Sequence, residues 1–74
     1  MVRNDALTNA LRSLKFKFSR QADRVMIWKQ KGSTNRVAVR RNQTHDDDYV
    51  RILLKQAGMP PSDIEAFITS TKTQ

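Results

Sequence analysis

The chain has 74 residues, no cysteine, and a net charge of +7 from 14 Lys and Arg against seven Asp and Glu. This length allows one modest hydrophobic core, so we predict a single domain over residues 1–74 without a deep catalytic cleft. The lack of cysteine excludes a disulfide framework and a thiolate metal site, and no apolar run approaches the roughly 18 residues that a membrane span requires.

The first predicted element is a helix over about residues 5–14. Its apolar residues recur at the spacing of one helix face: Leu7, Ala10, Leu11 and Leu14. Asn4 or Asp5 can accept hydrogen bonds from the free amides of the first turn. The segment therefore predicts an amphipathic helix with one buried face.

Three short strands are predicted next. From Lys15 the pattern has a period of two, in which Phe16 and Phe18 alternate with polar residues and are expected to face the core. Residues 24–29 enclose the apolar run Val-Met-Ile-Trp, and residues 36–40 alternate again. The sequence Lys-Gly-Ser-Thr-Asn at 31–35 is typical of a turn, so we expect an antiparallel meander.

The second half of the chain is predicted to be helical. One helix carries the apolar stripe Val50, Leu53, Leu54 and Ala57, with Thr44 or Asp46 as its cap and Gly58 as its left-handed end. Acidic side chains at 46–48 suit the positive end of its dipole. The run Thr-His-Asp-Asp-Asp at 44–48 would then be a solvated helix cap, in which neighbouring aspartates point to different sides and do not form a metal site.

A last helix is predicted after the two prolines at 60 and 61. Ser62 and Glu65 have the spacing of a capping box, and Ile64, Phe67 and Ile68 would be buried. Residues 69–74 lack apolar side chains, which predicts a flexible tail. The order α-β-β-β-α with an extra C-terminal helix predicts an α+β fold: a two-layer sandwich with helices on one face of a three-stranded antiparallel sheet.

Positive charge is concentrated in the predicted sheet. Residues 12–41 contain ten Lys and Arg against Asp23 alone, a net charge of +9, whereas residues 42–74 have a net charge of −2. A concentrated patch attracts a polyanion, and such binding weakens with salt. We predict a nucleic-acid interface on the open face and rim of the sheet, formed by Lys15, Lys17, Arg20, Arg24, Lys29, Lys31, Arg36, Arg40 and Arg41.

Trp28 allows two arrangements of the central strand. If Trp28 and Met26 face the helices, they belong to the core, and Val25 and Ile27 form an apolar spot on the open face. If the register is shifted by one residue, Trp28 lies among arginines and could stack on a base. The sequence alone leaves both open.

Several residues along the chain also resemble those of a known family, and they follow one another in the same order. Leu11, Phe16, Arg20-Gln21, Val37-Ala-Val39 and the run Ile52-Leu-Leu-Lys-Gln-Ala-Gly-Met59 are similar to HicA-type messenger-RNA interferases. The resemblance covers about residues 7–59. It implies the double-stranded-RNA-binding-domain fold, RNA rather than DNA as the ligand, and an endoribonuclease toxin held by an antitoxin.

The chain departs from that family at the catalytic position. Members typically carry Gly-Ser-His shortly after the Arg-Gln pair, with an aromatic residue three positions after the histidine. Aligning Trp28 with that aromatic residue places Val25 where the histidine would be, and valine cannot transfer a proton. We therefore expect RNA binding without the usual catalyst, and no catalytic residue is assigned.

Two alternatives accompany that expectation. An active HicA-like ribonuclease could use His45, the one histidine of the chain, beside the neighbouring carboxylates. A protein-interaction module could instead dock an acidic, antitoxin-like partner on Val25, Ile27 and an edge strand. In each case we expect a cytoplasmic protein without a cofactor, a metal or a membrane partner.

Overall fold

The computed structural model describes residues 1–71, which form three helices and five strands. The helices are α1 (Asn4–Ser13), α2 (Asp47–Gln56) and α3 (Pro61–Thr71). The strands are β1 (Val2–Arg3), β2 (Phe16–Gln21), β3 (Val25–Gln30), β4 (Arg36–Arg40) and β5 (Thr44–His45). The predicted α+β class and its order α-β-β-β-α with an extra helix are confirmed.

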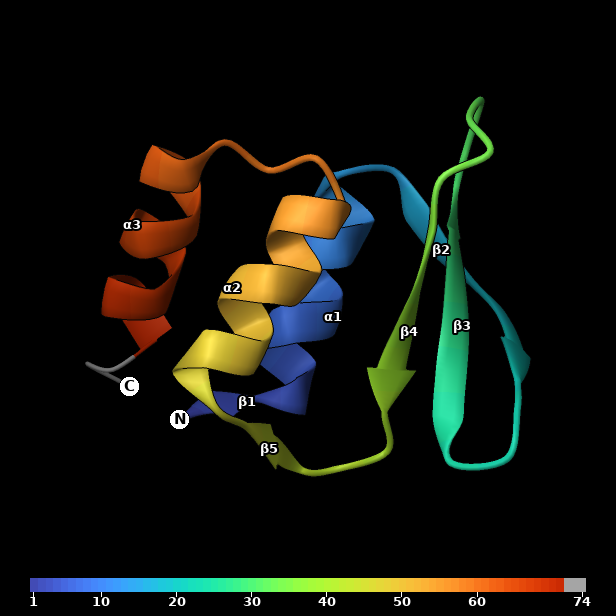
Figure 1. The fold of residues 1–74 in the computed structure, drawn as a ribbon, viewed down its shortest axis with the longest axis horizontal. Helices are drawn as coiled ribbons and strands as arrows, with labels where there is room; N and C mark the ends of the chain where they lie inside the picture. Colours follow the sequence, from blue (N-terminus) through green and yellow to red (C-terminus); the bar gives the residue numbers. More distant parts are fainter. Residues whose placement is uncertain (72–74) are drawn as a thin grey trace.

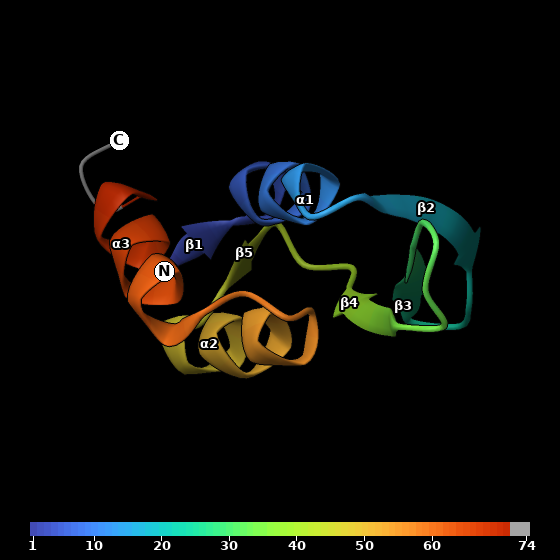
Figure 2. The same cartoon turned by 90° about the horizontal axis from the view of Figure 1, so that it is seen from above.

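The three long strands form one layer and the helices form the other (Figures 1 and 2). The sheet is antiparallel in the order β2-β3-β4, with α1 packed along β2 and α2 along β4. Helix α3 lies at the far end of the molecule, where it contacts α2 and β1. One face of the sheet is therefore covered by helices, and no described element covers the other, which we call the open face.

The core lies between these layers. Leu7 and Leu11 of α1 and Val50 and Leu54 of α2 are fully buried. They meet the buried side chains of the sheet, which are Phe16, Trp28, Val37 and Val39. Full burial of one such side chain stabilises the fold by about 1.5–3 kcal/mol, so these helix stripes hold the helices on the sheet.

The register of the sheet decides the position of Trp28. Trp28 pairs with Phe18 on one side and Val37 on the other, and its side chain is only 3% exposed. Trp28 is therefore a core residue, and the alternating residues Val25 and Ile27 face the open side. Both are half-buried there.

Phe18 differs from the prediction, because its side chain is 51% exposed rather than buried. It shares the helix-covered side of the sheet with Trp28, and the two rings meet edge to face at 6.1 Å between centroids. Strand β2 is an edge strand, and an irregularity between Phe18 and Arg20 bends it. At this edge of the sheet the helices leave about half of Phe18 open to solvent.

A second, two-stranded sheet was not predicted. Val2 pairs with His45 and Arg3 pairs with Thr44, which joins the start of the chain to the segment before α2. This pairing also changes the start of α1: Asn4 is its first helical residue, and its backbone N–H donates to the carbonyl of Gln43 over 2.8 Å. The predicted caps at Asn4 or Asp5 are thus wrong, because Arg3, held in β1, occupies the N-cap position.

The ends of α2 agree more closely with the sequence-based prediction. Asp46 occupies the N-cap position, although its side chain forms no capping hydrogen bond. Gly58 follows the helix with a φ of +95°, a left-handed conformation that glycine adopts without a steric penalty.

Helix α3 begins earlier and ends later than the sequence predicts. It starts at Pro61, where the missing N–H is harmless, and the amide of Ile64 donates to the carbonyl of Pro60. The predicted capping box is wrong, since α3 already begins at Pro61 and Ser62 therefore lies inside the helix. Glu65 pairs with Arg51 of α2. The helix continues through Thr71 because Ile68 is buried, so residues 69–71 are helical rather than a tail. The remainder of the predicted tail, 72–74, lies outside the described residues.

Candidate nucleic-acid interface

Three cations form a straight row across the open face. Lys17 of β2 lies opposite Lys29 of β3, which lies opposite Arg36 of β4. All three are exposed, and we call them the cation row. Like charges placed directly opposite one another on a sheet are destabilising, so the row stores repulsion that a bound polyanion would relieve.

None of the nine predicted cations is in an ion pair within residues 1–71. The ion pairs there join Met1 to Asp47, Arg3 to Asp5, and Arg51 to Asp48 and Glu65. All nine predicted side chains are exposed. The sheet therefore presents positive charge that no carboxylate of the described fold neutralises.

The next set of paired residues on the open face combines a charged side chain with apolar ones. Arg20 lies opposite Ile27, which lies opposite Ala38. Val25, the first residue of β3, lies opposite Arg40. The apolar spot predicted at Val25 and Ile27 is therefore present, but it is narrow, and Arg20 lies beside it.

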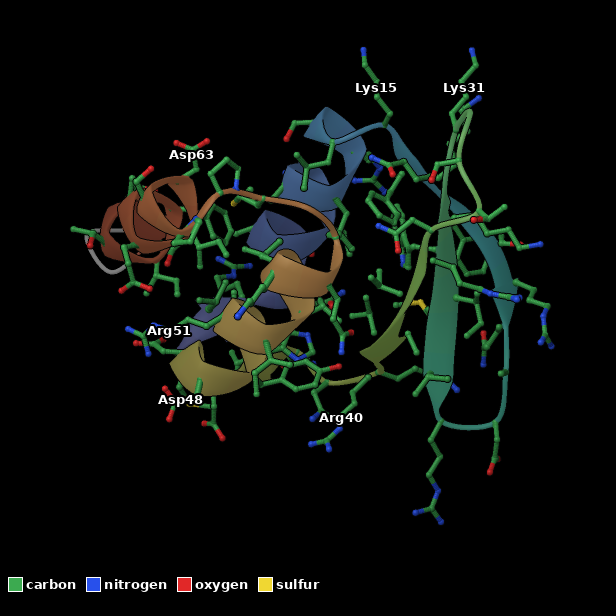
Figure 3. All side chains as sticks on the ribbon, turned by 45° about the horizontal axis from the view of Figure 1, so that its top comes forward. Lys15, Lys31, Arg40, Asp48, Arg51 and Asp63 are labelled. Atoms are coloured by element: carbon green, nitrogen blue, oxygen red, sulfur yellow. The ribbon has the colours of Figure 1, made fainter. Side chains whose placement is uncertain are left out.

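Lys15 and Lys31 stand together at one end of the sheet (Figure 3). The backbone N–H of Lys31 donates to the carbonyl of Lys15 over 2.8 Å, which holds the two residues side by side. Lys15 follows α1 with a φ of +72°, a left-handed conformation that is strained for a residue with a side chain. The structure thus places a lysine where a glycine would be favoured.

The other predicted cations lie at the opposite end of the sheet. The amide of Arg41 donates to the carbonyl of Arg24 over 3.3 Å, so these two are neighbours. Arg40 turns away from the open face: its guanidinium lies 5.0 Å from the centre of the Tyr49 ring on α2. The hydroxyl of Tyr49 accepts from the amide of Arg40 and donates to the carbonyl of Ala38. Arg40 is therefore a bridge to the helices more than a part of the open face.

Negative charge gathers on the helices instead. Figure 3 shows Asp48 and Asp63 on the helical side, away from Lys15 and Lys31. Arg51 donates to both Glu65 and Asp48 over 2.8 Å, and the hydrogen bond to Glu65 is the main reason that its pKa is raised. Charge is thus separated within the molecule: the carboxylates lie on the helices, and the basic sheet lies at the other end without ion-pair partners in the described fold.

His45 is buried, contrary to the solvated cap that the sequence indicated. Its ring is 3% exposed, stacks on Tyr49 at 5.3 Å between centroids, and has Nε2 3.0 Å from Oδ1 of Asn4. Burial, followed by the charge of Arg40, lowers its pKa. Because the ring is enclosed and Nε2 is engaged, His45 is not placed to take a proton from a ribose hydroxyl.

The aspartates beside His45 form no metal-binding group. Within residues 1–71, no three His, Asp or Glu side chains converge as metal ligands. Asp46, Asp47 and Asp48 instead lie at the first turn of α2, where their charge suits the helix dipole.

One feature of the surface was missed by sequence reasoning. A hollow of about 430 Å³ opens between the end of α1 and the β2 edge, and its aromatic lining is Phe16, Phe18 and Trp28. Four cations surround it: Arg12, Lys15, Lys17 and Lys31. We call this the aromatic hollow. The signal that could have shown it is the alternation of phenylalanine with lysine from Lys15 to Phe18.

Comparisons with protein-family models, with curated proteins and with solved structures found no match to this chain. Within residues 1–71, no helix has the length and apolar character needed to cross a membrane.

Proposed function

We propose that this protein binds RNA through the open face of the β2-β3-β4 sheet, with the cation row contacting consecutive phosphates. The observation that carries the proposal is the row itself: three exposed cations opposite one another without a carboxylate partner in the described fold. Such an arrangement costs stability in the free protein. It becomes favourable when phosphates lie across it, because binding releases their counterions.

The preference for RNA over DNA rests on the resemblance to HicA-type interferases. The α-β-β-β-α order that this resemblance implies is also the order of the longer elements α1, β2, β3, β4 and α2. Phosphate contacts by themselves position a nucleic acid without reading its sequence. We therefore propose binding that tolerates many sequences.

We further propose that binding takes place without cleavage. Val25, at the position aligned with the family histidine, is a half-buried residue at the start of β3, opposite Arg40. His45 is enclosed behind Tyr49. Neither side chain offers an exposed proton acceptor on the open face.

Replacing two members of the cation row tests the binding surface. In the Lys29→Gln/Arg36→Gln variant, we expect weaker binding to all RNA sequences, and the slope of log affinity against log salt should shrink by roughly 1.4–1.8. Retardation of a labelled RNA across a salt series measures both, and the same gels show any cleavage.

The matched control is Arg3→Gln/Lys55→Gln, which removes the same charge from exposed residues outside the β2-β3-β4 sheet. This control should lose much less affinity, because net charge changes equally but the row stays intact. Equal losses in the two variants would show that only total charge matters. Cleavage of the RNA by the wild-type protein would contradict binding without catalysis.

A further inference from the structure

We propose that the aromatic hollow holds one unpaired nucleobase, so that the protein favours single-stranded or looped RNA over a continuous duplex. This inference rests on the proposed function and specifies the form of RNA that the basic sheet receives. It follows from three features of the hollow: an exposed aromatic face, a ring of cations, and a strained lysine at its edge.

The exposed aromatic face belongs to Phe18. Half of this side chain is open to solvent, although Phe18 sits on the same side of the sheet as the core residue Trp28. Trp28 supports the ring from one side by an edge-to-face contact at 6.1 Å. Phe18 is therefore held in place with a free face, which is the surface that a base needs for stacking.

The cations around the hollow suit the phosphates that flank such a base. The guanidinium of Arg12 lies 5.2 Å from the centre of the Trp28 ring, which holds it beside the aromatic wall. Lys15 and Lys31 border the hollow as neighbours, and neither is in an ion pair within residues 1–71. A purely hydrophobic ligand would leave this charge uncompensated, whereas a nucleotide combines a flat apolar base with an anionic phosphate.

The backbone of Lys15 has a left-handed conformation that is unfavourable for a residue with a side chain. Its left-handed φ of +72° would suit glycine better, so the side chain is kept where the backbone disfavours it. In this position Lys15 lines the hollow together with Lys31. The turn that ends α1 thus places the Lys15 ammonium group at the edge of the hollow.

Lys17 connects the hollow to the cation row. It lines the hollow and is also the first member of the row across the open face. Because β2 is an edge strand, a single RNA strand can run across the open face and turn over this edge with one base in the hollow. In a regular A-form duplex the bases are stacked and paired, so no base is free to enter.

Fluorescence titration tests this geometry, because Trp28 is the only tryptophan of the chain and lines the hollow. The probes are a single-stranded oligoribonucleotide and a fully paired duplex with the same number of phosphates. We expect the single strand to quench Trp28 emission and to bind more tightly than the duplex. Tighter binding of the duplex would overturn the inference.

The variant Phe18→Leu removes the aromatic face and keeps an apolar side chain. We expect a roughly 5- to 150-fold loss of affinity for the single strand, little change for the duplex, and rescue by Phe18→Tyr, which can stack. The matched control Phe67→Leu, on α3, should bind as the wild type does. Thermal melting of each variant checks that the fold is retained, as expected for a half-exposed residue.

The outcomes separate the two proposals. If Phe18→Leu binds the single strand normally while Lys29→Gln/Arg36→Gln does not, the hollow holds no base and the open face still binds RNA. If the wild-type protein binds neither probe, the proposed function itself fails. If polyglutamate quenches Trp28 as strongly as the single strand does, the hollow receives acidic peptide and the inference is overturned.

Discussion

The imidazole of His45 is enclosed by Asn4 and Tyr49, and the positive charge of Arg40 lies close by. The sequence predicts a solvated helix cap at this position. Its position follows instead from β5, which pairs with β1 and turns the ring inward. At the scale of single residues, this burial has a measurable consequence for stability.

We expect the free energy of unfolding to fall as the pH drops below about 6.5. The unfolded chain binds a proton on His45 near the ordinary pKa of 6.5, whereas burial and Arg40 lower that pKa in the folded protein. Between these two pKa values only the unfolded chain is protonated, so acid favours unfolding. Above 6.5, and below the lower pKa, His45 contributes no slope.

Thermal unfolding between about pH 5 and pH 8 measures this effect. In the His45→Gln variant, the contribution of His45 to the slope of the unfolding free energy against pH should disappear within this window. The comparison of slopes does not depend on the absolute stability of the variant. An identical slope in the two proteins would show that His45 is protonated equally in both states.

At the scale of elements, α3 is an integral part of the fold. Ile64 and Ile68 are buried against the rest of the core, and Arg51 of α2 donates two hydrogen bonds to Glu65 of α3. Exposed ion pairs contribute little to stability, typically below about 1 kcal/mol. The buried isoleucines therefore hold α3 in place.

We expect Ile68→Ala to lower the free energy of unfolding by about 2–4 kcal/mol, because it leaves a cavity beside α2 and β1. The exposed neighbour Thr69 is the control, and Thr69→Ala should change stability by less than about 0.5 kcal/mol. Urea unfolding followed by circular dichroism measures both. A loss for Ile68→Ala no larger than that of the control would mean that α3 is not docked as described.

At the scale of the whole molecule, charge is separated between the sheet and the helices (Figure 3). The cation row repels itself, and the neutralising carboxylates lie on the helical side. The surface that is proposed to bind RNA should therefore lower the stability of the free protein.

We expect added sodium chloride to raise the unfolding midpoint between about 20 mM and 300 mM, because salt screens this repulsion. The Lys29→Gln/Arg36→Gln variant should be more stable than the wild type at low salt, by a few tenths to about 1 kcal/mol, and less sensitive to salt. Thermal melting across the salt series measures both. A variant that is less stable at low salt would show that the row does not store repulsion.

The amino-acid sequence by itself determined the long elements of this protein. Helices α1 and α2 and strands β2, β3 and β4 each carry enough apolar residues to show a period, and Gly58 has the backbone freedom that its position requires. The charge of the sheet was equally visible, since ten cations fall between residues 12 and 41 with one acid. These are local properties, which depend on neighbours along the chain.

Only the tertiary structure decided the features that depend on distant residues. Strands β1 and β5 are two residues long, too short for a periodic signal, and exist because Val2 meets His45. The register placed Trp28 in the core, and the open β2 edge left Phe18 exposed beside it. The cation row and the aromatic hollow both depend on which residues face each other across strands, and strand pairing is a contact between segments that no local pattern specifies.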